Sequence, residues 1–170
     1  MAVRRIARGL LWEEVCRNSL ERLRQDGRLY WFRNATPMVR VGEVTKSGTF
    51  PARYGAQAPP DYTILTAGGC AMLVDAKDCK VGRWEVRQVK DHQMEAMRRW
   101  KDMGGTAGIF LRMPDRSRWY IRYEILLPCW QARDAWAVGD VPGFEWEATT
   151  EGQPNFDWLT PFERGCPTGR

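Results

Sequence analysis

Two aspartates and one lysine stand at the ends of two apolar runs that are joined by a pair of glycines. Asp61 opens the first run, whereas Asp75, fourteen positions later, and Lys77 close the second. Successive side chains of a strand point to opposite faces, so Asp75 and Lys77 share a face if the second run is extended. Two carboxylates beside an ammonium group suit a divalent metal ion and an activated water. The spacing therefore indicates metal-dependent chemistry at the end of a hairpin.

The length of the turn between the two runs decides whether these side chains meet. If residues 68–69 alone formed the loop, Asp61 would pair with Ala76 and point away from Asp75. With the three-residue loop 67–69, whose last glycine is left-handed, Asp61 lies opposite Asp75 on one face. We expect the three-residue loop, because it lets two carboxylates and a lysine converge at one end of a sheet.

These residues resemble a known nuclease signature. Pro60-Asp61, followed by Asp75-Ala76-Lys77, is similar to the PD-(D/E)XK motif, with an aspartate at position 75 where glutamate is more usual. The motif is short and degenerate, so further matches are needed to identify a family.

Two further segments resemble RecU-type Holliday junction resolvases. Residues 88–97 are similar to the Asp-His-Gln helix that follows the metal site in that family, and they contain Gln93. Arg8-Gly9, followed by Glu13, matches the opening of the family. The resemblance extends over residues 8–123.

The resemblance implies both a fold and an activity. The fold is α/β (mixed α+β), a restriction-endonuclease-like mixed β-sheet flanked by helices, in a single nuclease domain over residues 1–170. The activity is that of a metal-dependent endonuclease that resolves four-way DNA junctions by paired symmetric nicks, as a homodimer. Mg²⁺ is the expected metal, and Mn²⁺ is expected to substitute for it. The expected metal ligands are Asp61, Asp75, the carbonyl of Ala76, and Glu13.

Two other residues complete the expected site. Lys77 would position the attacking water or stabilise the developing negative charge, and Gln93 would face the metal-site region. Four residues of this region also have a purely structural interpretation. Asp75 and Lys77 could form a surface ion pair, Glu13 could complement a helix dipole, and His92 is expected to be a hydrogen-bonding scaffold residue.

Two alternative functions stay open. One is a PD-(D/E)XK nuclease without junction preference, and the other is a non-catalytic DNA-binding module with the same fold. The presence of Asp61, Asp75 and Lys77 argues against the second, because a decayed site usually loses one of them.

Composition agrees with a DNA-binding protein. The net charge is +5 and the isoelectric point is about 9.1. Basic residues cluster in residues 1–40 and 77–122, which favours a polyanionic partner on one side of the molecule. No run of about eighteen apolar residues occurs, and the five cysteines include no close pair. We expect a reduced cytoplasmic protein without a zinc site, in which Cys16 and Cys70 are buried thiols.

Two segments are expected to contact DNA beyond the metal site. Residues 46–59 form a proline- and glycine-containing projecting loop, and the resemblance places there the stalk that enters the junction. Its expected DNA-binding residues are Lys46, Phe50, Arg53 and Tyr54, although the two aromatic rings could instead pack the loop onto the body. The short basic arm of residues 1–8 would add Arg4, Arg5 and Arg8, unless it is a disordered terminus.

Periodicity and turn signals predict the remaining elements. Helices are expected at residues 9–26, 84–103 and 130–138, and strands at residues 29–33, 38–45, 106–113 and 119–127. Residues 139–170 are expected to be turn-rich and to pack their aromatic side chains on the body or on a second protomer.

Overall fold

A six-stranded mixed β-sheet forms the body of the computed structural model, which describes residues 8–55 and 57–145. The strand order is β1-β4-β5-β7-β8-β10, and only the β5–β7 pair is parallel. The strands are β1 (Leu29–Arg33), β4 (Tyr62–Thr66), β5 (Ala71–Asp78), β7 (Thr106–Arg112), β8 (Arg118–Arg122) and β10 (Phe144–Glu145).

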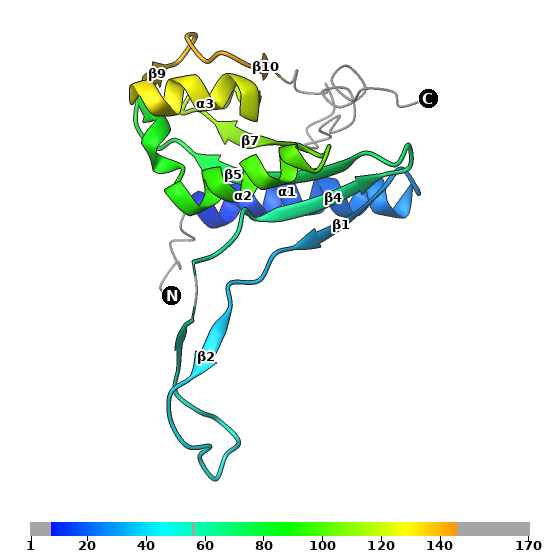
Figure 1. Ribbon diagram of the computed structural model, residues 1–170, viewed down its shortest axis with the longest axis vertical. Helices are drawn as coiled ribbons and strands as arrows, with labels where there is room; N and C mark the ends of the chain where they lie inside the picture. The colour runs from blue at the N-terminus through cyan, green and yellow to red at the C-terminus, as the bar shows by residue number, and fades with distance from the viewer. Residues whose placement is uncertain (1–7, 56, 146–170) are drawn as a thin grey trace, which may run out of the picture.

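Helices cover both faces of this sheet (Figure 1). Helix α1 (Arg8–Gln25) packs on one face, and helices α2 (Asp91–Asp102) and α3 (Tyr123–Ala132) pack on the other. Each face therefore has its own apolar cluster. The mixed sheet flanked by helices confirms the predicted fold class.

The first helix follows the predicted pattern closely. Trp12, Cys16 and Leu20 have exposures of 1% or less and pack against the sheet. The helix ends where Gly27 adopts a φ of +68°, and the amide of Arg28 donates to the carbonyl of Leu23. A left-handed glycine at this point is a common helix stop, so the predicted end is confirmed.

A separate two-stranded ladder projects from the body (Figure 1). It pairs β2 (Met38–Arg40) with β3 (Ala52–Tyr54), and we call residues 34–55 and 57–60 the stalk. The strand predicted at residues 38–45 is thus shorter, and β3 lies inside the segment predicted as a loop. The projection begins earlier in the chain than predicted, because both arms of a hairpin are needed to build it.

The helix predicted at residues 84–103 begins later. Residues 83–85 form β6 (Arg83–Glu85), which pairs with β9 (Ala135–Ala137), and a 3-10 turn η1 (Val86–Gln88) follows. Trp84 is fully buried against Trp136, with ring centroids 5.3 Å apart. The helix itself starts after Lys90, whose amide donates to the side chain of Gln93 in a capping box. The local sequence pattern favours a helix at Trp84, but packing against Trp136, which is far away in the sequence, places Trp84 in a strand, and the helix begins only at its capping box.

The predictions for residues 119–127 and 130–138 are wrong beyond Arg122. β8 ends at Arg122 and helix α3 begins at the next residue, so the second half of the expected strand is helical. The expected helix at 130–138 ends at Ala132 and gives way to β9. Leu126 is fully buried. Short apolar runs fit either period, so tertiary packing decides between them.

Three further observations concern features predicted from composition. Cys16 is a buried free thiol as expected, but Cys70 is half-buried and takes part in a disulfide, which corrects the expected thiol. No helix among residues 8–55 and 57–145 is long and apolar enough to cross a membrane. The predicted basic arm and most of the turn-rich segment 139–170 lie outside the described residues.

Gly108 in β7 tests how tightly the centre of the sheet is packed. A Cβ atom at this position would lie 2.3 Å from the carbonyl oxygen of Ile121 and 2.9 Å from the ring of Tyr120. We expect Gly108→Ala to destabilise the protein by about 3 kcal/mol in urea unfolding, because the neighbouring backbone cannot move away. Gly82→Ala is the control, since a Cβ there meets nothing within 4 Å. Equal stabilities of the two variants would contradict the prediction.

Candidate metal centre

The β4–β5 hairpin has the predicted three-residue loop. The amide of Thr66 donates to the carbonyl of Cys70 (2.9 Å), and the amide of Gly69 donates back to Thr66 (2.9 Å) with a φ of +80°. Tyr62 pairs with Val74, so the preceding residue, Asp61, stands opposite Asp75. The register that brings the two carboxylates together is therefore confirmed.

Asp75 is the buried centre of the site, with 1% exposure. Its Oδ1 accepts a hydrogen bond from Gln93 Nε2 (2.8 Å), and its Oδ2 lies 2.5 Å from Lys77 Nζ. Lys77 is thus the ion-pair partner of this buried oxygen, and no other donor among the described residues reaches Oδ2. Burial raises the pKa of Asp75 to about 7; the charge of Lys77 opposes this shift and that of Asp61 adds to it. Additional positive charge near Asp75 would favour its ionised form.

Asp61 lies at the point where the stalk joins β4. Its Oδ2 accepts a hydrogen bond from the backbone amide of Ala76 (2.8 Å). The base of the stalk is held by Asn34, whose amide donates to the Asp61 carbonyl (2.8 Å) and whose Nδ2 donates to the Pro60 carbonyl (2.6 Å). Oδ1 of Asn34 also accepts a hydrogen bond from Thr63 (3.1 Å). These bonds fix the backbone on both sides of Asp61.

Gln93 links the helix α2 to the two charged residues of β5. Besides its bond to Asp75, its Oε1 accepts from Lys77 Nζ (3.2 Å) and from the Lys90 amide (3.1 Å). The same side chain therefore caps the helix and orients both charged groups. The prediction that Gln93 faces the metal-site region agrees with this geometry.

Glu13 does not join the carboxylates of Asp61 and Asp75. Its carboxylate forms an ion pair with Arg33 (2.8 Å), and its backbone carbonyl accepts a hydrogen bond from the Tyr62 hydroxyl (3.1 Å). Within residues 8–55 and 57–145, no three His, Cys, Asp or Glu side chains come close enough together to hold a metal ion. The described site is thus built from two carboxylates.

Two carboxylates are sufficient to bind a hard divalent cation such as Mg²⁺. Mg²⁺ usually keeps several waters and binds through one or two carboxylates plus phosphate oxygens of the substrate. The buried Oδ2 of Asp75, the facing acid Asp61 and the Ala76 carbonyl offer hard oxygen ligands of this kind. The residues present therefore fit a divalent metal ion.

Sequence reasoning missed Asn34 and Arg33. Asn34 lies between the strands predicted at residues 29–33 and 38–45, and its role depends on contacts with residues more than twenty positions away. The Asn-Ala-Thr-Pro run is a turn signal, which could have marked the residue as a backbone partner but not identified which backbone. His92 makes no side-chain hydrogen bond to any described residue, so the expected scaffold role is not seen there.

The residues predicted to contact DNA are placed as follows. Lys46, Phe50, Arg53 and Tyr54 are all exposed on the stalk. Neither aromatic ring packs the stalk onto the body. Arg4 and Arg5 lie outside the described residues, and only the backbone of Arg8, at the start of α1, is described.

Comparison with known proteins identifies the family. Residues 7–140 match the family RecU, described as Recombination protein U. The chain belongs to the RecU family. Among solved structures, this RecU-family chain is similar to Hjc, a Holliday junction resolvase from the archaeal hyperthermophile Archaeoglobus fulgidus, at 17% identity and a TM-score of 0.39. That match covers 66% of this chain and 77% of Hjc, and no curated protein matches the sequence.

Membership of the RecU family and the geometry of the site agree with each other. The match spans Asp61, Asp75, Lys77 and Gln93 and includes the whole stalk. All four side chains meet at one end of the β4–β5 hairpin. The resemblance noted from short motifs is therefore confirmed at the level of the family.

Proposed function

We propose that this RecU-family protein is a metal-dependent, structure-selective endonuclease that resolves four-way DNA junctions by paired nicks. The observation that carries the chemistry is the facing pair Asp61 and Asp75 beside Lys77. An isolated ion pair on a strand would not need a second acid, nor a glutamine that binds both partners. The arrangement is what hydrolysis of a phosphodiester requires.

Asp61, Asp75 and the Ala76 carbonyl are the proposed ligands of Mg²⁺, and Mn²⁺ is proposed to substitute for it. When bound, the metal would supply an activated water and neutralise charge on the phosphate. Glu13 would reach this ion only after its ion pair with Arg33 opens.

Lys77 and Gln93 would prepare the site for the attacking water. The side chain of Lys77 is 18% exposed, so it is partly open to solvent while its ammonium group contacts Asp75 and Gln93. From this position it can orient a water or stabilise the negative charge that develops on the phosphate oxygens. Gln93 holds both side chains in place, because its amide donates to one and its carbonyl accepts from the other.

A homodimer is the proposed active form. Two nicks related by the two-fold symmetry of a junction require two sites in the same relation, which a two-fold dimer provides. Tyr30, Phe32 and Leu65 are each about half exposed and lie on one face of the paired strands β1 and β4. An exposed apolar group of this kind supports a protein contact. Sedimentation of the protein over a range of concentrations measures the assembly directly.

A cleavage assay on two DNA substrates tests the proposed function. A labelled four-way junction and a linear duplex of matched sequence are incubated with the protein during a titration with Mg²⁺, and a second series uses Mn²⁺. We expect symmetric nicks in the junction, little cleavage of the duplex, and none in excess EDTA. Equal cleavage of both substrates would favour a nuclease without junction preference. Metal-independent binding without cleavage would favour a DNA-binding module. Separately from this test, we propose that the protein acts in the cytoplasm.

A further inference from the structure

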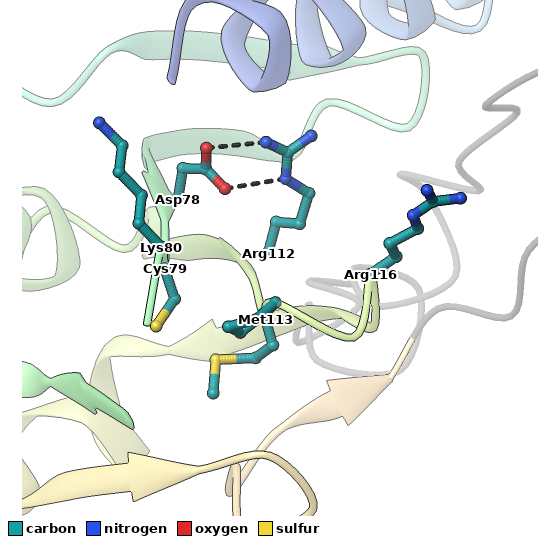
Figure 2. A pocket seen from close by; sticks show the side chains of 7 residues that line it. Asp78, Cys79, Lys80, Arg112, Met113 and Arg116 are labelled. Carbon is teal, nitrogen blue, oxygen red and sulfur yellow. Dashed lines mark hydrogen bonds and ion pairs between the residues drawn. The ribbon is translucent and has the colours of Figure 1, made fainter. Parts of the chain in front are cut away.

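A cavity of about 410 Å³ lies at the ends of β5 and β7. Because these two strands are parallel, both reach the same edge of the sheet, the edge that also carries Asp75 and Lys77. Asp78 follows Lys77 directly, but successive residues of a strand point to opposite faces. Asp75 and Lys77 face helix α2, whereas Asp78 and its partner Arg112 face helix α1, so the cavity and the metal centre lie at the same end of the strands but on opposite faces of the sheet. Its lining includes Asp78, Lys80, Arg112 and Arg116 (Figure 2).

The charges of this cavity are unbalanced. Asp78 and Arg112 neutralise each other through two bonds, Nε to Oδ1 (2.8 Å) and Nη2 to Oδ2 (2.7 Å). Lys80 and Arg116 stand on either side of this pair in Figure 2. Both are exposed, and neither has an ion-pair partner in the described part of the chain. Two positive charges therefore remain for an anionic ligand.

Arg116 occupies a backbone position that normally belongs to glycine. In the β7–β8 turn, the Met113 amide donates to Ser117 (2.9 Å) and the Arg116 amide donates to Met113 (2.9 Å) with a φ of 72°. The β4–β5 turn has the same two bonds, and there Gly69 occupies the corresponding left-handed position. A side chain in this conformation is strained, and such strain is concentrated at functional sites. The fold alone would favour glycine at position 116.

We propose that this cavity binds the phosphate backbone of the DNA that enters the metal centre, and that Arg116 and Lys80, on either side of the Asp78–Arg112 pair, each contact a phosphate. The proposal rests on the nuclease function proposed above. Because the cavity and the metal centre lie on opposite faces at the same end of β5, the bound phosphate would be a different one from the scissile phosphate. Contacts to phosphates fix the register of a protein on DNA, so this pocket would position the cleaved strand.

The substitution Arg116→Gly separates this role from a structural one. It removes one phosphate contact and relieves the strained backbone, so we expect opposite changes in two measurements. The dissociation constant for a four-way junction, measured in EDTA, is expected to rise roughly tenfold, the effect of losing one charged hydrogen bond. The slope of log K against log salt is expected to decrease by about one unit. The melting temperature is expected to increase, whereas damage to the fold would lower it.

Arg133→Gly is a matched control within the same chain. Arg133 is also an exposed arginine in the left-handed conformation, with a φ of 60°, but it caps helix α3 outside the cavity. The control removes the same charge and the same strain, so its melting temperature is expected to rise while its DNA affinity stays unchanged. Equal loss of affinity in the two variants would mean that only overall charge matters, and would overturn the proposal.

Neutral methylphosphonate linkages locate the contacted phosphate. Phosphates of the cleaved strand are replaced one at a time, and binding in EDTA is compared between the wild-type protein and Arg116→Gly. We expect the wild type to be sensitive at the phosphate that Arg116 contacts, which is not the scissile one, and the variant to lose sensitivity at that position alone. If both proteins respond identically at every position, the pocket does not hold a phosphate. If the wild type neither binds nor cleaves junctions, the proposed nuclease function fails first, and the pocket proposal fails with it.

Discussion

Asp75→Asn is expected to abolish junction cleavage and to leave junction binding nearly unchanged. Asp75 is buried and cannot meet a DNA phosphate directly, so its loss removes no contact to the backbone. Its carboxylate is instead the proposed metal ligand that faces Asp61. A bound metal contributes several kcal/mol to catalysis of this kind, so the cleavage rate should decrease on the order of 10³-fold or more.

Cleavage and gel-shift assays on the same preparation measure both effects. Asp102→Asn is the control, since it makes the same chemical change at an exposed acid on α2 that pairs with Arg98. Asp75→Glu is a second variant, which keeps an acid at the site and should retain measurable cleavage. Full cleavage by Asp75→Asn would remove Asp75 from the metal centre, and loss of binding would mean that the substitution has disturbed the fold.

The metal centre could be predicted from the sequence because its residues lie close together in the chain. Asp61 and Asp75 belong to one hairpin, and the period of two in a strand ties their relative orientation to the length of a single turn. The turn residues Gly68 and Gly69 favour the left-handed position that the three-residue loop requires. Register, face and proximity therefore follow from about fifteen consecutive residues.

The partners of that pair were less accessible, because they come from distant parts of the chain. Gln93 was expected near the site only through the resemblance to a family, since nothing within α2 identifies which strand its amide will meet. Asn34 holds the backbone around Asp61 through tertiary contacts alone, and no local pattern distinguishes it from an ordinary turn residue.

Element boundaries failed where packing overrides local periodicity. Residues 119–125 alternate as a strand does, yet the chain turns into α3 at Tyr123, and Leu126 is buried there. Trp84 lies at the start of a plausible helix but is drawn into a small ladder with Trp136. In both cases the deciding contact is with a residue far away in the sequence, which single-sequence patterns do not contain.

Shortening the stalk is expected to remove junction preference while preserving the fold and the metal centre. The stalk exposes large apolar side chains that no core covers: Met38, Val39, Val41, Val44, Phe50 and Tyr54. An isolated two-stranded hairpin gains little stability in water, so this apolar surface is not explained by folding. It is explained if the side chains contact unstacked bases at the centre of a junction, while Lys46 and Arg53 contact phosphates.

The structure indicates which residues of the stalk can be replaced. The Gly55 amide donates to the Pro37 carbonyl (2.9 Å), so the two arms lie side by side at this level. Replacing residues 38–54 with a short Gly-Ser turn should therefore leave the Asn34 contacts and Asp61 in place. Competition between junction and duplex DNA measures selectivity, and sedimentation and metal-dependent cleavage show that the body is intact. Selectivity should decrease by roughly ten- to hundredfold for each stacked base that is lost.

Two smaller variants separate stacking from charge in the full-length stalk. Phe50→Ser with Tyr54→Ser removes the rings and keeps the cations, so junction preference should be lost while the salt dependence of binding stays the same. Lys46→Ser with Arg53→Ser removes the charges, so binding to junction and duplex should weaken together. If the shortened protein still chose junctions as strongly as the wild type, the stalk would not recognise the branch point. Selectivity would then have to come from the spacing of the two metal centres in a dimer. A junction would match this spacing, and a duplex would not.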